Sequence, residues 1–231
     1  MLVVKISDRI KKTKMRFDII TIFPHCLDSY VNESILKRAQ EKKLIDIHFH
    51  DIRKFTSDKW HKVDDTPYGG GPGMILQIEP LFKCLESIPK QKKHIIALLD
   101  PAGKQFNQKT AIKFAKIDQL ILIAGRYEGV DARIYKYIDQ RISIGPYVLA
   151  GGELASAIVV EATSRLIQGV LGSTESLKNE SFVGSINELS DYPQYSRPEI
   201  FNKQRVPKVL LSGNHQLIKK WRDSKRKKIY E

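Results

Sequence analysis

Two glycine-rich segments in the middle of the chain have the composition of loops that hold a flat, uncharged ring. They are residues 125–129 (GRYEG) and residues 145–153 (GPYVLAGGE). Glycine lets the backbone approach a ligand closely because it has no side chain. Backbone N–H and C=O groups can then read the edge of a ring such as adenine, while apolar neighbours pack on its faces. Either segment alone fits an ordinary turn into a helix, but both together favour a binding pocket.

A third glycine-rich segment, residues 68–74 (YGGGPGM), is less informative. It lacks the Gly-Lys-Ser/Thr ending of a phosphate-binding P-loop, and it does not lie between a strand and a helix as a dinucleotide fingerprint does. We therefore expect a tight turn here rather than a ligand contact.

Basic residues surround an aromatic one near the end of the chain. Residues 214–228 carry Lys219, Lys220, Trp221 and Arg222, with further bases after them. Such a helix suits contact with RNA phosphates and stacking on a base. It is equally compatible with a surface helix that Trp221 anchors to the body.

The histidines and cysteines predict no metal site. His48 and His50 share one face of a predicted strand without a third ligand, so we expect them on the solvent side. Cys26 and Cys84 are 58 positions apart and form no CxxC motif. Reduced thiols of a cytoplasmic protein are the simplest interpretation.

Strands and helices alternate along most of the chain, which predicts an α/β fold with a parallel sheet covered by helices on both faces. Ligands bind such sheets at the carboxyl ends of the strands, where the loops 100–103, 125–129 and 145–152 are expected to line one pocket. The expected strands are residues 16–23, 44–52, 94–99, 119–124 and 141–144. The expected helices run from Pro24 to Ala39 and over residues 78–88, 107–116, 130–138 and 153–167.

The pattern changes after residue 171. Residues 172–179 are polar and aperiodic and read as a flexible linker, and residues 180–231 contain three prolines and no convincing strand. The expected organisation is a basic extension (1–14), an α/β domain (15–171), the linker, and a small, mainly helical domain (180–231).

The net charge of +13 is concentrated at the two ends. Residues 1–14 carry five bases and one acid, and residues 218–231 carry seven bases and two acids. This clustering indicates a polyanionic partner such as nucleic acid, although solvated tails would have the same composition. No apolar run approaches the length of a membrane span, and the first residues do not read as a secretory signal.

Many ordered motifs together resemble one family, the bacterial tRNA (guanine-N1)-methyltransferases of the SPOUT, or trefoil-knot, superfamily. The similarity runs from Met15 to about Arg222. It rests on residues 15–24, 65–74, 100–103, 125–129, 144–153, 169–172, 180–182, 195–199 and 206–215.

The resemblance implies a deep trefoil knot at the C-terminal end of the first domain, which chain-topology rules alone would not suggest. It implies a homodimer with active sites at the subunit interface, S-adenosylmethionine as methyl donor and magnesium dependence. The implied reaction methylates N1 of the guanosine immediately 3′ of the tRNA anticodon, at position 37, where another guanosine precedes it.

The resemblance also implies roles for individual residues. Glu180 matches the general base, where the family usually has aspartate, and Arg165 matches an arginine that stabilises charge on guanine O6. From the residues alone, Glu180 reads as an exposed linker acid and Arg165 as a surface residue. A second departure is Pro146, where many members have aspartate. The implied cofactor-binding residues are Leu98, Leu99, Pro101, Gly125, Tyr127, Glu128, Ile144, Gly145, Tyr147, Leu149, Gly151 and Gly152.

Two rival functions stay open at this point. A knotted methyltransferase acting on another RNA would differ in the C-terminal half, where residues 180–182 and 195–199 fit the guanine-N1 family. A non-catalytic RNA-binding protein is favoured only by the charge.

Overall fold

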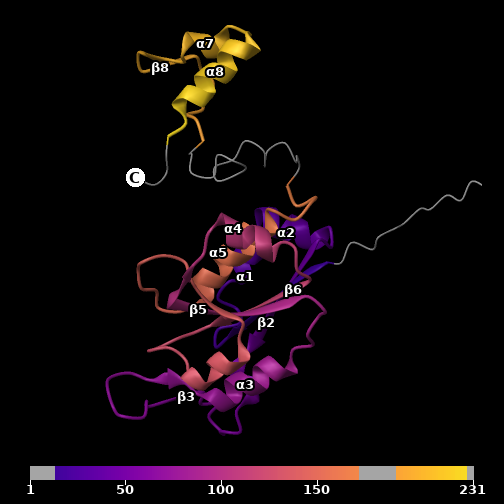
Figure 1. Ribbon diagram of the computed structural model, residues 1–231, viewed down its shortest axis with the longest axis vertical. Coiled ribbons are helices and arrows are strands. Elements are labelled where there is room, and N and C mark those ends of the chain that lie inside the picture. Colours follow the sequence, from indigo (N-terminus) through magenta and orange to yellow (C-terminus); the bar gives the residue numbers. More distant parts are fainter. Residues whose placement is uncertain (1–13, 172–190, 228–231) are drawn as a thin grey trace, which may run out of the picture. The chain divides into compact units, whose positions relative to one another are not determined.

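The computed structural model describes residues 14–171 and 191–227, which belong to two compact units, Met1–Gly172 and Ser173–Glu231 (Figure 1). The first unit is built on a five-stranded sheet in the order β2-β1-β6-β5-β7. All of its strand pairs are parallel, which confirms the predicted sheet. The strands are β1 (Met15–Thr21), β2 (Ile45–Asp51), β5 (His94–Gln105), β6 (Gln119–Ala124) and β7 (Gln140–Ser143).

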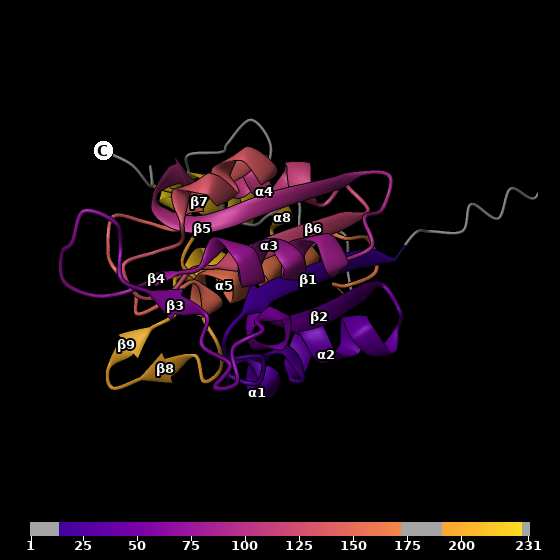
Figure 2. The same ribbon diagram turned by 90° about the horizontal axis from the view of Figure 1, so that it is seen from below.

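Helices cover both faces of this sheet because successive side chains of a strand point to opposite sides. Phe17 and Ile19 of β1 belong to one apolar core and Ile20 to the other. Figure 2 shows the helices around the sheet. The first core packs under α1 (Asp28–Val31), α2 (Ser34–Glu41), α4 (Gln108–Phe114) and α5 (Glu153–Ser164). The second packs under α3 (Ile78–Ser87) and the 3₁₀ helices η1 (Ile52–Phe55) and η2 (Ala132–Tyr137).

Strand β5 differs from its prediction. It continues past Leu99 to Gln105, and both Leu99 and Lys104 pair with Ile142 of β7. The intervening residues, predicted as a loop at the end of the strand, therefore form a bulge within it. Residue 103 is a glycine for a steric reason, because a Cβ there would lie 2.5 Å from the main-chain carbonyl carbon of Arg141.

Two predicted helices also take different forms. The expected helix from Pro24 to Ala39 is two short helices, α1 and α2, and the chain turns between them through Ser34, whose φ is +49°. The expected helix over residues 130–138 is the 3₁₀ helix η2, in which the Asp131 carboxylate accepts a hydrogen bond from Arg133 N. Helical periodicity of apolar residues does not distinguish these variants.

The expectation that His48 and His50 are solvent-side residues holds only in part for His50, whose side chain is 21% exposed. Its Nε2 lies 2.7 Å from Oδ1 of Asp18, whose side chain is fully buried. His48 is more exposed and lies 3.2 Å from Asp46. The parallel register of β1 and β2 brings His50 to Asp18, and this register cannot be read from either strand alone.

Asp18 is a buried acid satisfied from three sides. Arg16 Nε donates to it at 2.8 Å and Gln119 Nε2 at 2.7 Å, in addition to the His50 contact. Burial by itself raises the pKa of the Asp18 carboxyl, but the hydrogen bonds from His50, Arg16 and Gln119 outweigh it and hold the pKa at about 2.

We expect Asp18 to contribute to acid sensitivity. Because its pKa is lower in the folded chain than in the unfolded one, its stabilisation is present above about pH 4 and is lost as the pH falls toward 2. The loss amounts to about 2 kcal/mol. Urea unfolding at several pH values should therefore show a weaker pH dependence below pH 4 for Asp18→Asn. Parallel curves for variant and wild type would contradict this role.

Two short antiparallel hairpins lie outside the five-stranded sheet. In the first unit, β3 (Asp64–Asp65) pairs antiparallel with β4 (Ile75–Leu76). In the second, β8 (Ile200–Phe201) pairs with β9 (Gln204–Arg205), which corrects the expectation of no strand after residue 180.

The second unit also contains α7 (Lys208–Leu211) and α8 (His215–Lys225). The Asn214 side chain begins α8 by accepting hydrogen bonds from the N–H groups of Gln216 and Leu217. The ring of Trp221 lies 6.3 Å from that of Tyr195. Among the residues that the structure describes, no helix has the length and apolar character that a membrane crossing requires.

Candidate active site

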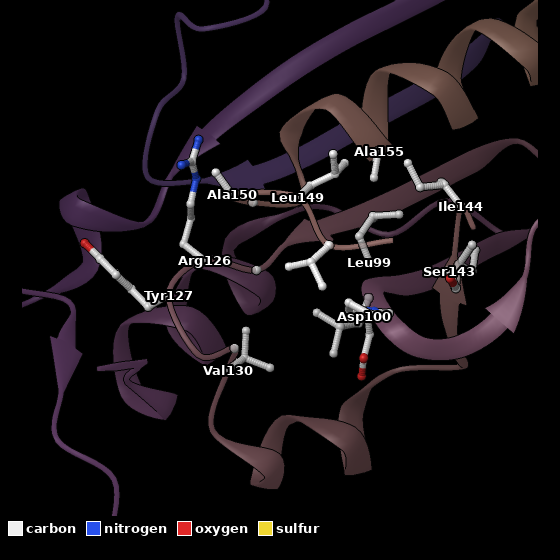
Figure 3. Close-up of a pocket in the computed structure, with 18 of the residues that line it drawn as sticks. Leu99, Asp100, Arg126, Tyr127, Val130, Ser143, Ile144, Leu149, Ala150 and Ala155 are labelled. Carbon is white, nitrogen blue, oxygen red and sulfur yellow. The ribbon is translucent and has the colours of Figure 1, made fainter. Parts of the chain in front are cut away.

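A cavity of about 320 Å³ opens at the carboxyl ends of β6 and β7 and beside the bulge of β5 (Figure 3). The three glycine- or proline-containing segments predicted to meet at this edge all contribute to it. All of the residues predicted to bind the cofactor line this cavity, namely Leu98, Leu99, Pro101, Gly125, Tyr127, Glu128, Ile144, Gly145, Tyr147, Leu149, Gly151 and Gly152. The structure thus brings these residues together, and their contact with a cofactor stays a prediction.

The two loops predicted from their glycines are joined directly to each other. Gly152 N donates to Gly125 O at 2.8 Å, and Arg126 forms an isolated antiparallel bridge with Gly151. Gly152 must be glycine because a Cβ there would lie 2.7 Å from the Cα of Ala124. Glycine therefore serves close packing between the loops as well as the approach of a ligand.

A buried polar network fixes the same two loops, and sequence reasoning missed it. Arg126 Nε donates to Glu153 Oε2 at 2.9 Å, while Thr21 Oγ1 donates to Glu153 Oε1 at 2.7 Å. Glu153 is only 3% exposed, so these partners replace the hydrogen bonds that its side chain would otherwise make to water. The Arg126 guanidinium also lies 4.6 Å from the ring centre of Phe23. The network joins three separate segments of the chain, at residues 21–23, 126 and 153, so spacing gave no signal.

The β3–β4 hairpin supports one side of the cavity. Glu128 N donates to Met74 O at 3.0 Å, and Leu76 N donates to Gly129 O at 3.0 Å. The segment 68–74 contributes no side chain to the cavity lining, in agreement with the expectation of a turn. Tyr68 is fully exposed and precedes three glycines with positive φ.

The interior of the cavity suits a flat, uncharged ring. Leu99, Leu149 and Ala155 lie around the same space (Figure 3). Gly125 leaves room on the cavity side, because the nearest atom to an added Cβ would be Val130 Cγ1 at 3.6 Å. Tyr127 and Tyr147 also line the cavity and are about half exposed, so their rings lie where the cavity opens to solvent. Further lining residues that were not predicted are Asp100, Arg126, Gly129, Val130, Tyr135, Ile142, Ser143, Val148, Ala150 and Ala155.

The two predicted catalytic residues are not part of this lining. Arg165 follows α5, with its N–H bonded to Glu161 O at 3.1 Å. It lies ten residues beyond Ala155, about 15 Å along a helix at 1.5 Å per residue. Glu180 lies outside the described residues, as do the predicted extension up to residue 13 and the linker 172–179. Within residues 14–171 and 191–227, no cluster of three acidic, histidine or cysteine side chains could hold a metal ion.

The fold and the cavity define an α/β protein with a pocket at the carboxyl edge of a parallel sheet. Comparison of sequences makes the class specific: the profile of the family described as tRNA (Guanine-1)-methyltransferase TrmD matches residues 15–230. The chain belongs to this family.

Curated relatives support the same assignment. A tRNA (guanine-N(1)-)-methyltransferase of Clostridium botulinum is 48% identical over 211 residues, which are 91% of this chain and 86% of the relative. One from Dictyoglomus turgidum is 50% identical over 208 residues, 90% of this chain and 83% of the relative. One from Carboxydothermus hydrogenoformans is 47% identical over 209 residues, 90% and 81% respectively.

Proposed function

We propose that this protein transfers a methyl group from S-adenosylmethionine to N1 of the guanosine immediately 3′ of the tRNA anticodon, at position 37. Membership of the family, with relatives named for guanine-N1 methylation of tRNA, carries the proposal. The cavity supports it, because the residues expected at the cofactor surround a single space. The reaction and the free thiols Cys26 and Cys84 fit a cytoplasmic protein.

The cavity residues fit the proposed cofactor. Leu99, Val130 and Ala155 would pack against the adenine ring, and the backbone of the Gly125 loop, which lines the same cavity, would reach its edge. Bound S-adenosylmethionine supplies a methyl group on a sulfonium, so the methyl donor is already activated. The protein then has to hold the guanine in line with it, and positioning of this kind supplies up to about 7–11 kcal/mol. Magnesium dependence stays a prediction from the resemblance.

Proton removal is the chemistry left to the side chains. Guanine N1 carries a proton at neutral pH and is a poor nucleophile until that proton leaves. Glu180 is our proposed general base for this proton. Negative charge then grows on guanine O6, and the planar guanidinium of Arg165 is proposed to stabilise it.

We further propose a knotted fold and a homodimer in which two subunits share each active site. The distance between the cavity at the start of α5 and Arg165 beyond its end supports a shared site, because one subunit alone separates these groups. After β7 the chain returns to the loop that follows β6, where Gly152 N donates to Gly125 O, and this return supports the proposed knot.

Mixed dimers test the shared site. Gly151→Val should impair the pocket and Glu180→Gln the base, so each homodimer should be nearly inactive when the cofactor concentration is far below the dissociation constant of the valine variant. If the base comes from the partner subunit, each mixed dimer contains one intact site, and random mixing should restore about a quarter of wild-type activity. If both groups come from one subunit, no intact site forms and mixing restores nothing, which would contradict the proposal.

The second unit is proposed to hold tRNA. The guanidinium of Arg222 lies 4.9 Å from the ring centre of Tyr192, and Trp221 lies beside Tyr195 on the same unit. Aromatic rings with adjacent cations suit stacking on bases and contact with phosphates. A small helical domain reading the anticodon stem is the corresponding expectation.

Deleting residues 1–14 should weaken tRNA binding without changing which nucleoside is methylated. This extension carries five bases and one acid, so binding of the truncated protein should release fewer counterions from the RNA than binding of the full chain does. A plot of log K against log salt should become shallower by at most about 4. Loss of methylation in the truncated protein would instead assign the extension to the fold.

Two measurements test the proposal as a whole. The first is calorimetry with S-adenosylmethionine and its analogues. The second is methylation of bulk tRNA that lacks the modification. Cofactor binding and formation of 1-methylguanosine are expected. Absence of cofactor binding would favour a non-catalytic RNA-binding protein, and another methylated nucleoside would favour a methyltransferase with a different RNA target.

A further inference from the structure

An exposed tryptophan stands on a turn between η1 and β3, outside the cavity. Trp60 is 77% exposed. A single exposed apolar side chain needs no explanation by itself, because folded proteins expose many. What sets Trp60 apart is that the surrounding chain holds its backbone in a defined turn and places exposed lysines before and after it in the sequence.

Asp58 organises this turn. Its Oδ1 accepts hydrogen bonds from Trp60 N at 2.8 Å and Lys62 N at 3.1 Å, and its main-chain oxygen accepts one from His61 N at 3.0 Å. His61 has a φ of +55°. Arg53 Nη1 of η1 donates to His61 O at 3.1 Å, which ties the turn to the body. The backbone of Trp60 is therefore held in place before any partner arrives, which lowers the entropy cost of binding.

The same framework reaches the cavity. Val63 is fully buried, and its carbonyl accepts a hydrogen bond from Gln77 N at 2.8 Å. The following strand β3 pairs with β4, next to Met74, whose carbonyl accepts the hydrogen bond from Glu128 N. The turn is thus connected through one hairpin to a loop that lines the cavity.

Positive charge identifies the kind of partner. Lys54, Lys59 and Lys62 are exposed, and Lys59 Nζ lies 5.0 Å from the centre of the Trp60 ring. Asp58 is the acid within residues 53–62, and its carboxylate is engaged by the turn. An aromatic face with lysines around it complements an unpaired nucleobase flanked by phosphates better than it complements an apolar protein surface.

We propose that Trp60 stacks on an unpaired base of the tRNA substrate other than the methylated guanine, with Lys59 and Lys62 at the neighbouring phosphates. This inference rests on the proposed function. The turn that carries Trp60 would then be an RNA-binding surface of the first unit, in addition to α8 of the second. Its contacts would position the RNA beside the cavity.

Three substitutions at Trp60 distinguish stacking from other roles in direct tRNA binding. Trp60→Ala and Trp60→Leu should each weaken binding by about 5-fold to 100-fold, the range for losing one stacked base. Trp60→Phe keeps an aromatic face and should stay within about threefold of wild type. Leucine retains apolar bulk without a π face, so Trp60→Leu is the decisive variant. Affinity for S-adenosylmethionine should be unchanged in all three.

The lysines have a matched control. Lys62→Gln should make the salt dependence of tRNA binding shallower by about 0.7–0.9. Lys113→Gln, on α4 against the other face of the sheet, removes the same charge and should leave the salt dependence unchanged.

Two results would overturn the inference while leaving the proposed function intact. One is a wild-type protein that methylates tRNA while Trp60→Leu binds tRNA as tightly as wild type. The other comes from the Trp221→Phe variant, in which Trp60 is the one remaining tryptophan. If self-association shields its fluorescence from quenching by iodide before RNA is added, the partner of Trp60 is a second copy of the chain. Failure of wild-type methylation would instead count against the proposed function.

Discussion

Glu180→Gln is expected to slow methyl transfer by about 10²–10⁴-fold, the contribution of a positioned general base. Glutamine keeps the shape of the side chain and removes its basicity, so the guanine N1 proton has no acceptor. The rate should be measured in a single turnover with saturating tRNA and cofactor, because product release then does not mask the chemical step.

The control is Glu180→Asp, which introduces the residue that the family usually has at this position. It should retain substantial activity, and cofactor affinity should be nearly unchanged in both variants, because the cavity is formed by other segments. A glutamine variant within a few-fold of wild type would remove Glu180 as the base. Arg165 acting with a bound water would then be the more plausible chemistry.

Gly151→Val is expected to weaken S-adenosylmethionine binding by about 10-fold to 100-fold, equivalent to losing one or two positioned hydrogen bonds. An added Cβ would overlap Arg126 Nε and lie 2.6 Å from Glu153 Oε2. Arg126 would have to swing away, and the buried Glu153 carboxylate would lose its ion-pair partner. The two loops that line the cavity would then separate. Calorimetry on a variant shown to be folded measures the effect.

A double-mutant cycle separates this mechanism from direct contact with the ligand. If displacement of Arg126 is the cause, Gly151→Val should do little further harm in an Arg126→Ala background. Full additivity of the two changes would show that the valine acts on the cofactor itself. Unchanged affinity in folded Gly151→Val would move the pocket elsewhere.

The sheet and the cavity could be predicted because they depend on local signals. Strand β6 occupies the predicted residues 119–124, since an uninterrupted apolar run of this length is typical of a central parallel strand. The segments 125–129 and 145–152 follow β6 and β7, which lie on either side of β5, so the parallel arrangement was sufficient to bring them to one edge.

The remaining features depend on contacts between distant segments. The bulge at residues 100–103 arises where β5 packs against β7, and its proline and glycine read locally as a turn. The pairs Asp18–His50 and Arg126–Glu153 join different elements, and neither partner carries a sign of the other. Arg165 and Glu180 were assigned only through the family resemblance, because nothing in their local sequence distinguishes a catalytic residue from a surface charge.

The central claim is the position and identity of the methylated atom. The most direct measurement uses two tRNA transcripts that differ only in the nucleotide before the target guanosine, with labelled S-adenosylmethionine and mapping of the product nucleoside. We predict 1-methylguanosine at the position 3′ of the anticodon in the transcript with a preceding guanosine, and much less in the other. Label at another position or on another atom, or no label in either transcript, would contradict the account.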